Sequence, residues 1–157
     1  MIRARSINKP PRGQRGSVLI WFALLLPVLL GFAALVIDLA RLYLTKVELQ
    51  NAADAAALAG AYKYAQTTSL PAAIAEAKDL ATSNQVNGSP IPLSSVTPAD
   101  KTVTGYTYGI QVTIALSGMN LIFAPVLGMT TSDVQATAIA AANTVVHPAV
   151  PTPILVQ

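Results

Sequence analysis

The fold of this 157-residue chain is decided by residues 18–37, which read Val18-Leu19-Ile20-Trp21-Phe22-Ala23-Leu24-Leu25-Leu26-Pro27-Val28-Leu29-Leu30-Gly31-Phe32-Ala33-Ala34-Leu35-Val36-Ile37. None of these side chains is charged. A helix that rises about 1.5 Å per residue carries this run across roughly 30 Å, the thickness of the hydrocarbon core of a bilayer. The run therefore predicts a transmembrane helix over residues 17–38, with the lipid bilayer as a partner.

The charges before the run predict how the helix is oriented. Five basic residues precede it, with no acidic residue among them: Arg3, Arg5, Lys9, Arg12 and Arg15. Short segments rich in Lys and Arg stay on the cytoplasmic side of a membrane. Residues 1–16 are therefore expected to be a cytoplasmic tail, and the chain from about residue 38 onward to lie outside. No aromatic residue is interleaved with these charges, so no nucleic acid is expected as a partner.

A cleavable signal peptide is the alternative interpretation of the apolar run. Signal peptides have a shorter apolar core of about 7–15 residues, followed by a cleavage site of small residues. Here the run continues into Asp38-Leu39-Ala40-Arg41-Leu42-Tyr43, which has a helical pattern. Retention as a membrane anchor is therefore favoured.

The helical pattern continues beyond the predicted span. Apolar and small residues recur at helical spacing, and no proline lies between Pro27 and Pro71. This predicts a helical stalk over residues 39–66. Four-residue spacing places small side chains on shared faces of that stalk, where another backbone can approach closely. The candidates for helix packing are Ala52, Ala53, Ala56, Ala57 and Gly60. They are expected to pack under the protein's own head domain or, alternatively, to mediate self-association with a neighbouring subunit.

Asp38 stands at the outer end of the apolar run. An ionised carboxylate is costly within hydrocarbon, so the residue is expected to lie in the outer interface, with Arg41 as a partner. One interpretation is that Asp38 only marks the depth of the helix. The other is that it makes a specific contact.

The exterior region predicts a small α+β domain over residues 67–147. Residues 71–81 have the pattern of a second helix, with Ser69 as its N-cap, and Asn87-Gly88 marks a turn after it. Apolar residues then alternate with polar or small ones within residues 102–116 and again within residues 134–140, as in strands with one covered face. The predicted fold is thus a long transmembrane helix that continues as a stalk and carries a head, in which a helix packs on a short antiparallel sheet. Residues 148–157 form a proline-rich tail.

Residues 119–128 form a short apolar stretch between the two predicted strands. At this length the stretch does not cross a bilayer. It is expected to be a buried crossover or, alternatively, an exposed patch that contacts a partner or the membrane.

Side chains that carry chemistry are sparse. The chain has no cysteine, and its single histidine, His147, has no second imidazole with which to hold zinc. The acidic residues are scattered, and no glycine-rich phosphate loop follows a predicted strand. The sequence therefore predicts no enzyme, no cofactor and no metal site.

Four blocks of sequence within residues 13–62 form a specific combination: Arg15-Gly16-Ser17; Leu26-Pro27-Val28-Leu29-Leu30-Gly31; Val36-Ile37-Asp38-Leu39-Ala40-Arg41-Leu42-Tyr43; and Leu49-Gln50-Asn51-Ala52-Ala53-Asp54-Ala55-Ala56-Ala57-Leu58-Ala59-Gly60-Ala61. Together they closely resemble the N-terminal segment of the TadE/TadG-like proteins of bacterial Flp (tight-adherence) pilus assembly. The resemblance implies a single-pass inner-membrane protein with a periplasmic or other extracytoplasmic domain, found with other pilus-assembly proteins. It implies no catalytic residue.

Gly16 and Ser17 form a candidate processing site. In pilins and pseudopilins a peptidase cuts after a glycine that precedes the apolar helix, and a glutamate is typical at the fifth position of the mature chain. Cutting after Gly16 would place Trp21 there. Without a carboxylate, the new terminal ammonium would lack a compensating charge in an apolar filament core. An uncleaved structural anchor of the pilus assembly or secretion apparatus is therefore favoured, and the alternatives are a processed minor pilin or pseudopilin and a tethered periplasmic binding module.

Overall fold

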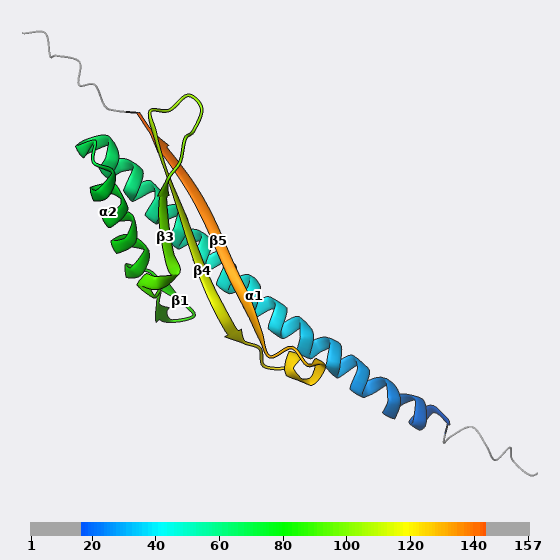
Figure 1. Ribbon diagram of the computed structural model, residues 1–157. Helices are drawn as coiled ribbons and strands as arrows, with labels where there is room; N and C mark the ends of the chain where they lie inside the picture. Colours follow the sequence, from blue (N-terminus) through cyan, green and yellow to red (C-terminus); the bar gives the residue numbers. More distant parts are fainter. Residues whose placement is uncertain (1–16, 144–157) are drawn as a thin grey trace, which may run out of the picture.

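The computed structural model describes residues 17–143, in which one long helix carries a second helix and a small sheet (Figure 1). The helices are α1 (Ser17–Thr67) and α2 (Leu70–Ser83), with short 3-10 turns η1 (Leu93–Ser95) and η2 (Ala124–Leu127). The strands are β1 (Gln85–Val86), β2 (Ser89–Pro90), β3 (Val96–Asp100), β4 (Tyr108–Asn120) and β5 (Thr131–Ala142). The α+β class with a long N-terminal apolar helix and an antiparallel sheet is thereby confirmed.

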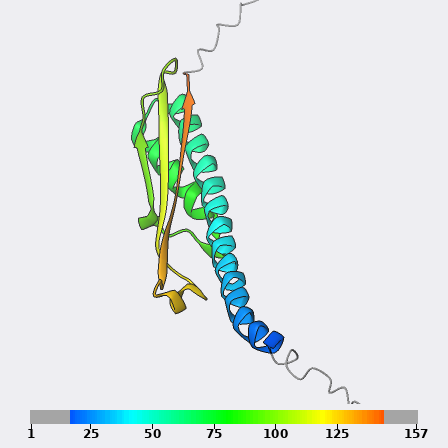
Figure 2. The same ribbon diagram turned by 90° about the vertical axis from the view of Figure 1, so that its right-hand side faces the viewer.

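The head has two layers. The strands β3, β4 and β5 form an antiparallel sheet in that order. Helix α1 packs on β4 and β5, and α2 packs on α1 and β3, so both helices cover the same face of the sheet (Figures 1 and 2). The N-terminal part of α1 extends beyond the sheet, and its apolar side chains are exposed.

The predicted alternation in the two long strands is confirmed. Ile110, Val112 and Ile114 of β4 are fully buried, and they pair across the ladder with Ala140, Ala138 and Ala136 of β5. The small alanines of β5 leave room for α1 to lie close to the sheet. Strand β4 begins later than the predicted segment because the turn that follows β3 takes up residues 101–107. At its other end the strand extends beyond the predicted segment, to Asn120.

One core joins the predicted stalk and the predicted head. Its cluster contains residues of α1, from Leu49 to Ala61, together with residues of α2 and of all three strands of the larger sheet. Tyr64 of α1 stacks on Tyr108 of β4 with ring centroids 4.0 Å apart, and loss of solvent there raises the pKa of Tyr64 above its usual value. The residues predicted as a stalk, 39–66, therefore share one core with the predicted head, as expected if the stalk packs under it.

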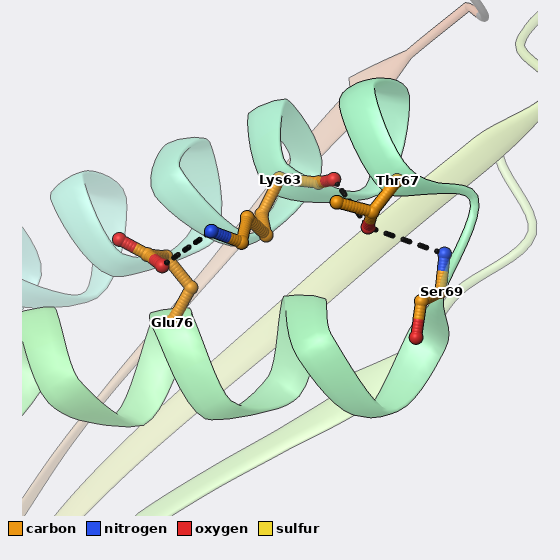
Figure 3. A network of polar contacts seen from close by, with 4 residues as sticks. All are labelled: Lys63, Thr67, Ser69 and Glu76. Carbon is orange, nitrogen blue, oxygen red and sulfur yellow. Dashed lines mark hydrogen bonds and ion pairs between the residues drawn. The ribbon is translucent and has the colours of Figure 1, made fainter.

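Helix α2 forms where it was predicted, and Ser69 is its N-cap residue. Ser69 has the backbone conformation of an N-cap, yet its side chain makes no capping hydrogen bond. The buried residues are Ala73, Ala77 and Ala81, whereas Ile74 is only half-buried. At the corner between the helices Lys63 forms an ion pair of 3.4 Å with Glu76, and the Thr67 hydroxyl accepts a hydrogen bond from the Ser69 amide (Figure 3). The ion pair is solvent-exposed and contributes little to stability.

Three strands were not predicted from the sequence. The strands β1 and β2 flank the Asn87-Gly88 turn, whose two residues both have positive φ, as a tight hairpin turn requires. Strand β3 contains Pro98, which has no N–H group to donate to a neighbouring strand. Its position at the edge of the sheet makes this proline acceptable.

Gly60 provides the first test of this packing. A Cβ atom there would lie 3.1 Å from Ala77 Cβ and 3.1 Å from Ile110 Cγ2, where α1 meets α2 and the sheet. We expect Gly60→Val to lower the free energy of unfolding of the head by about 2 kcal/mol, because overpacking forces the layers apart. Thermal unfolding followed by circular dichroism in detergent micelles measures this effect.

The matched control is Gly31→Val, since no atom lies within 4 Å of a Cβ built at Gly31. It should leave the unfolding midpoint of the head unchanged. Equal midpoints for the two variants would contradict the close approach at Gly60.

Candidate functional site

Asp38 binds a distant segment of the chain through its side chain. It is 3% exposed, and its carboxylate accepts three backbone hydrogen bonds. Oδ1 accepts from the Ile122 amide at 2.9 Å, and Oδ2 accepts from the amides of Phe123 and Ala124, both at 2.8 Å. These bonds fasten the loop between β4 and β5 to α1.

The three amides need such a partner because they stand at the start of η2. The first N–H groups of any helical turn have no acceptor within it, and a side-chain oxygen commonly supplies one. Here the acceptor comes from another helix, and because it is a carboxylate the bonds are charge-assisted. Within residues 17–143 no ion pair within 4 Å joins Asp38 to Arg41, and the charge of Arg41 favours the carboxylate from a greater distance. The carboxylate itself faces the loop.

The loop that Asp38 binds exposes apolar side chains to solvent. We call residues 121–130 the tip. Val126 is 90% exposed, and Ile122, Leu127 and Met129 are each more than half exposed. Only Ala124 is buried in η2. The expectation of a buried crossover is therefore wrong, because the tip lies beyond the end of the sheet core (Figures 1 and 2). The exposure that the alternative requires is present, and contact with a partner or the membrane stays a prediction.

An apolar groove separates the tip from the predicted membrane span. It has a volume of about 280 Å³ and is lined by Val28, Gly31, Phe32, Ala34 and Leu35 of α1 and by Phe123, Ala124, Val126 and Leu127 of the tip. The lining residues of α1 all precede Asp38 in the chain. The tip thus lies alongside the outer part of the apolar run and not above it.

A bulge in β4 precedes the tip. The register shifts between Leu116 and Met119, where Gly118 has a φ of 70°, and the Gly118 amide donates to Asp133 Oδ1 at 2.8 Å. Such a bulge bends and twists the strand that contains it. The end of β4 is therefore shaped locally by one glycine and one aspartate.

A second polar contact fastens the head to α1 further from the apolar run. The Asn87 amide donates to a Glu48 carboxylate oxygen at 2.8 Å, and the Asn87 side chain bonds to the hydroxyl of Thr45, which is fully buried. Helix α1 therefore holds the β1–β2 turn and the tip by separate polar contacts, with Asp38 and Thr45 two turns apart.

The family of this segment can be named from the comparisons with known proteins. Residues 16–65 match the family described as putative Flp pilus-assembly TadE/G-like. The resemblance found in the sequence is thereby confirmed for this segment. Searches of the curated proteins and of the solved structures gave no match.

The TadE/G-like match coincides with α1 almost residue for residue. The match includes the apolar run, Asp38 and the small-residue stripe, by which we mean Ala52, Ala53, Ala56, Ala57 and Gly60. The tip and the sheet lie outside the match. Within residues 17–143 α1 is the one helix with the length and composition to cross a membrane. The helix and the family match together suggest a single-pass membrane protein related to Flp pilus assembly, and a structural role for it.

The small-residue stripe lies inside the head. Ala52, Ala53, Ala56 and Ala57 are at most 1% exposed, and Gly60 is buried with them beneath α2 and the sheet. Self-association through these residues would therefore require the head to leave the helix.

The remaining predicted sites fall largely outside the described residues. This applies to Arg3, Arg5, Lys9, Arg12 and Arg15 and to Gly16; Ser17 is the first residue of α1. Among residues 17–143 no group of three or more His, Cys, Asp or Glu side chains is arranged to hold a metal ion.

Replacement of Asp38 tests the contact with the tip. Asp38→Ala leaves three amides without their acceptor, and we expect a loss of about 3 kcal/mol in the stability of the tip against local opening. Hydrogen exchange measured by mass spectrometry should show much faster exchange at residues 122–124, with little change at residues 110–114.

The matched control is Asp54→Ala on the same helix, since the Asp54 carboxylate is exposed and bonds to the Gln50 side chain. It should leave exchange at the tip unaltered. Unchanged exchange in Asp38→Ala as well would show that the tip does not depend on the carboxylate.

Proposed function

We propose that this protein is a membrane-anchored structural component of a bacterial Flp pilus assembly or secretion apparatus. The observation that carries the proposal is the continuity of α1, a 51-residue helix. Its N-terminal part presents exposed apolar side chains of the length that a bilayer requires, and its C-terminal part is a core element of the head. A head built on the membrane helix itself has a fixed distance and orientation from the bilayer, which suits a scaffold for other assembly proteins.

The proposed orientation places residues 1–16 in the cytoplasm and the head in the periplasm or outside the cell. The support is the asymmetry of charge, because the five basic residues of the tail have no acidic neighbour. The inner membrane is the membrane in which such a tail would be retained.

The orientation is tested by single cysteines, since the chain has none of its own. Ser94→Cys is on the exposed surface of η1, and Ser6→Cys is in the tail. In cells with a permeabilised outer membrane, an impermeant thiol reagent should label Ser94→Cys readily and Ser6→Cys only after the inner membrane is opened. The reverse pattern would reject the orientation.

The surface left for partner proteins includes the solvent side of α1. Tyr43, Leu58 and Tyr62 project there, each exposed by more than half, and the helix is not covered on this side by the head. Large aromatic and apolar side chains of this kind are enriched where proteins associate. They are the proposed positions of contact with other pilus-assembly proteins.

Anchor and minor pilin differ at the N-terminus. Trp21 occupies the position at which a processed pilin has its typical glutamate, so the proposal is that residues 1–16 are retained. Intact-mass measurement of the protein extracted from membranes should give the mass of the unprocessed chain, with or without the initiating methionine.

A mature chain that begins at Ser17 would instead identify a processed minor pilin or pseudopilin. The variant Gly16→Ala is the control for that outcome, because blocking a glycine-specific peptidase should then restore the full mass. A secreted protein that is cut beyond Ile37 would contradict both the anchor and the minor pilin, and would identify the apolar run as a signal peptide.

A further inference from the structure

The tip and the apolar run lie at the same depth. Leu35 and Val28, which line the groove, precede Asp38 by three and ten residues, or about 4.5 and 15 Å along the helix axis. The carboxylate of Asp38 holds the backbone of residues 122–124 at this level. If residues 18–37 occupy the hydrocarbon core, the tip cannot remain wholly in water, because it is fixed beside their outer half.

The side chains of the tip fit a lipid environment. The chain has no charged residue from Leu121 to Ser132. Its most exposed side chains are Val126, Leu127, Ile122 and Met129, all apolar. A contiguous apolar surface of this kind on a soluble domain marks a site of interaction.

The backbone of the tip also fits lipid, where every N–H group needs an acceptor within the protein. Three of its amides donate to Asp38. Four more donate to carbonyls of the tip itself: Leu121 to Thr130, Val126 to Phe123, Gly128 to Pro125 and Met129 to Ala124. Pro125 has no N–H group to satisfy. Because most of its donors are satisfied within the protein, the loop can leave water at a reduced cost.

We propose that the tip is inserted in the outer leaflet of the membrane, with phospholipid acyl chains in the groove between η2 and α1. This inference rests on the membrane anchoring proposed above. The head would then contact the bilayer at two places, the helix and the tip, which resists tilting of the head about the helix. The lipid is favoured over a second copy of the chain because the groove is continuous with the span that lipid must already surround.

Tryptophan fluorescence tests the insertion in the full-length protein. Trp21 is the single tryptophan, so Trp21→Phe provides a background without indole. Val126→Trp is then placed in that background, and the protein is reconstituted in phosphatidylcholine vesicles containing lipid spin-labelled near the headgroup end of the acyl chain. An apolar surface at the interface lies about 5–10 Å within the headgroup and acyl boundary, so the indole should lose roughly half of its emission.

Leu58→Trp in the same background is the matched control. Leu58 is 66% exposed on α1, and 20 residues beyond Asp38 it stands about 30 Å further from the bilayer. Its emission should be at long wavelength and unquenched. Met129→Trp provides a second position in the tip, and it should behave as Val126→Trp does.

The outcomes separate this inference from the anchoring itself. If native Trp21 is quenched by spin-labelled lipid while Val126→Trp and Met129→Trp are not, the anchor stands and insertion of the tip is rejected. If Trp21 is not quenched either, the anchoring fails. If the emission of Val126→Trp shifts to long wavelength as lipid dilutes the protein, a second copy and not lipid covers the tip, which also overturns the inference.

Discussion

A single unbroken helix has to satisfy two environments, and the rest of the structure depends on that constraint. The first part of α1 has apolar side chains on every side, as lipid requires, and the second part has a small-residue face against α2 and the sheet. Because an α-helix keeps its hydrogen bonds internal, the backbone can pass from one environment to the other without interruption. The head is consequently assembled on a helix whose other end has the length and composition of a membrane span.

The transition between the two environments occurs at Asp38. A buried carboxylate would be strongly destabilising alone, but three backbone amides satisfy it, and those amides in turn would be unsatisfied without it. The contact therefore secures both the end of the apolar run and the loop of the β4–β5 hairpin. The alternative that treated Asp38 only as a marker of depth missed this reciprocity. Asp38 makes a specific contact with the tip, as the other interpretation of this residue predicted.

Much of the fold could be read from the sequence because its signals are local. The alternation at Ile110, Val112 and Ile114 is visible without knowing what covers the strand, and the long helix follows from the absence of proline between Pro27 and Pro71. Strand β3 could not be read in the same way. It is short and contains Pro98, so only its pairing with β4 makes it a strand. The stripe at Ala52, Ala56 and Gly60 predicted close packing, but two different partners would have produced the same pattern.

The sequence by itself determined the apolar helix, the alternating strands and the likeness to TadE/G-like proteins, since each depends only on residues that are close together in the chain. Only the tertiary structure decided that the predicted stalk is part of the core and that an apolar tip lies beside the span. The reason is physical: Asp38 and its partners are separated by 84–86 positions in the chain. Their meeting depends on a bulge at Gly118 and on the register of two strands, which no local periodicity encodes.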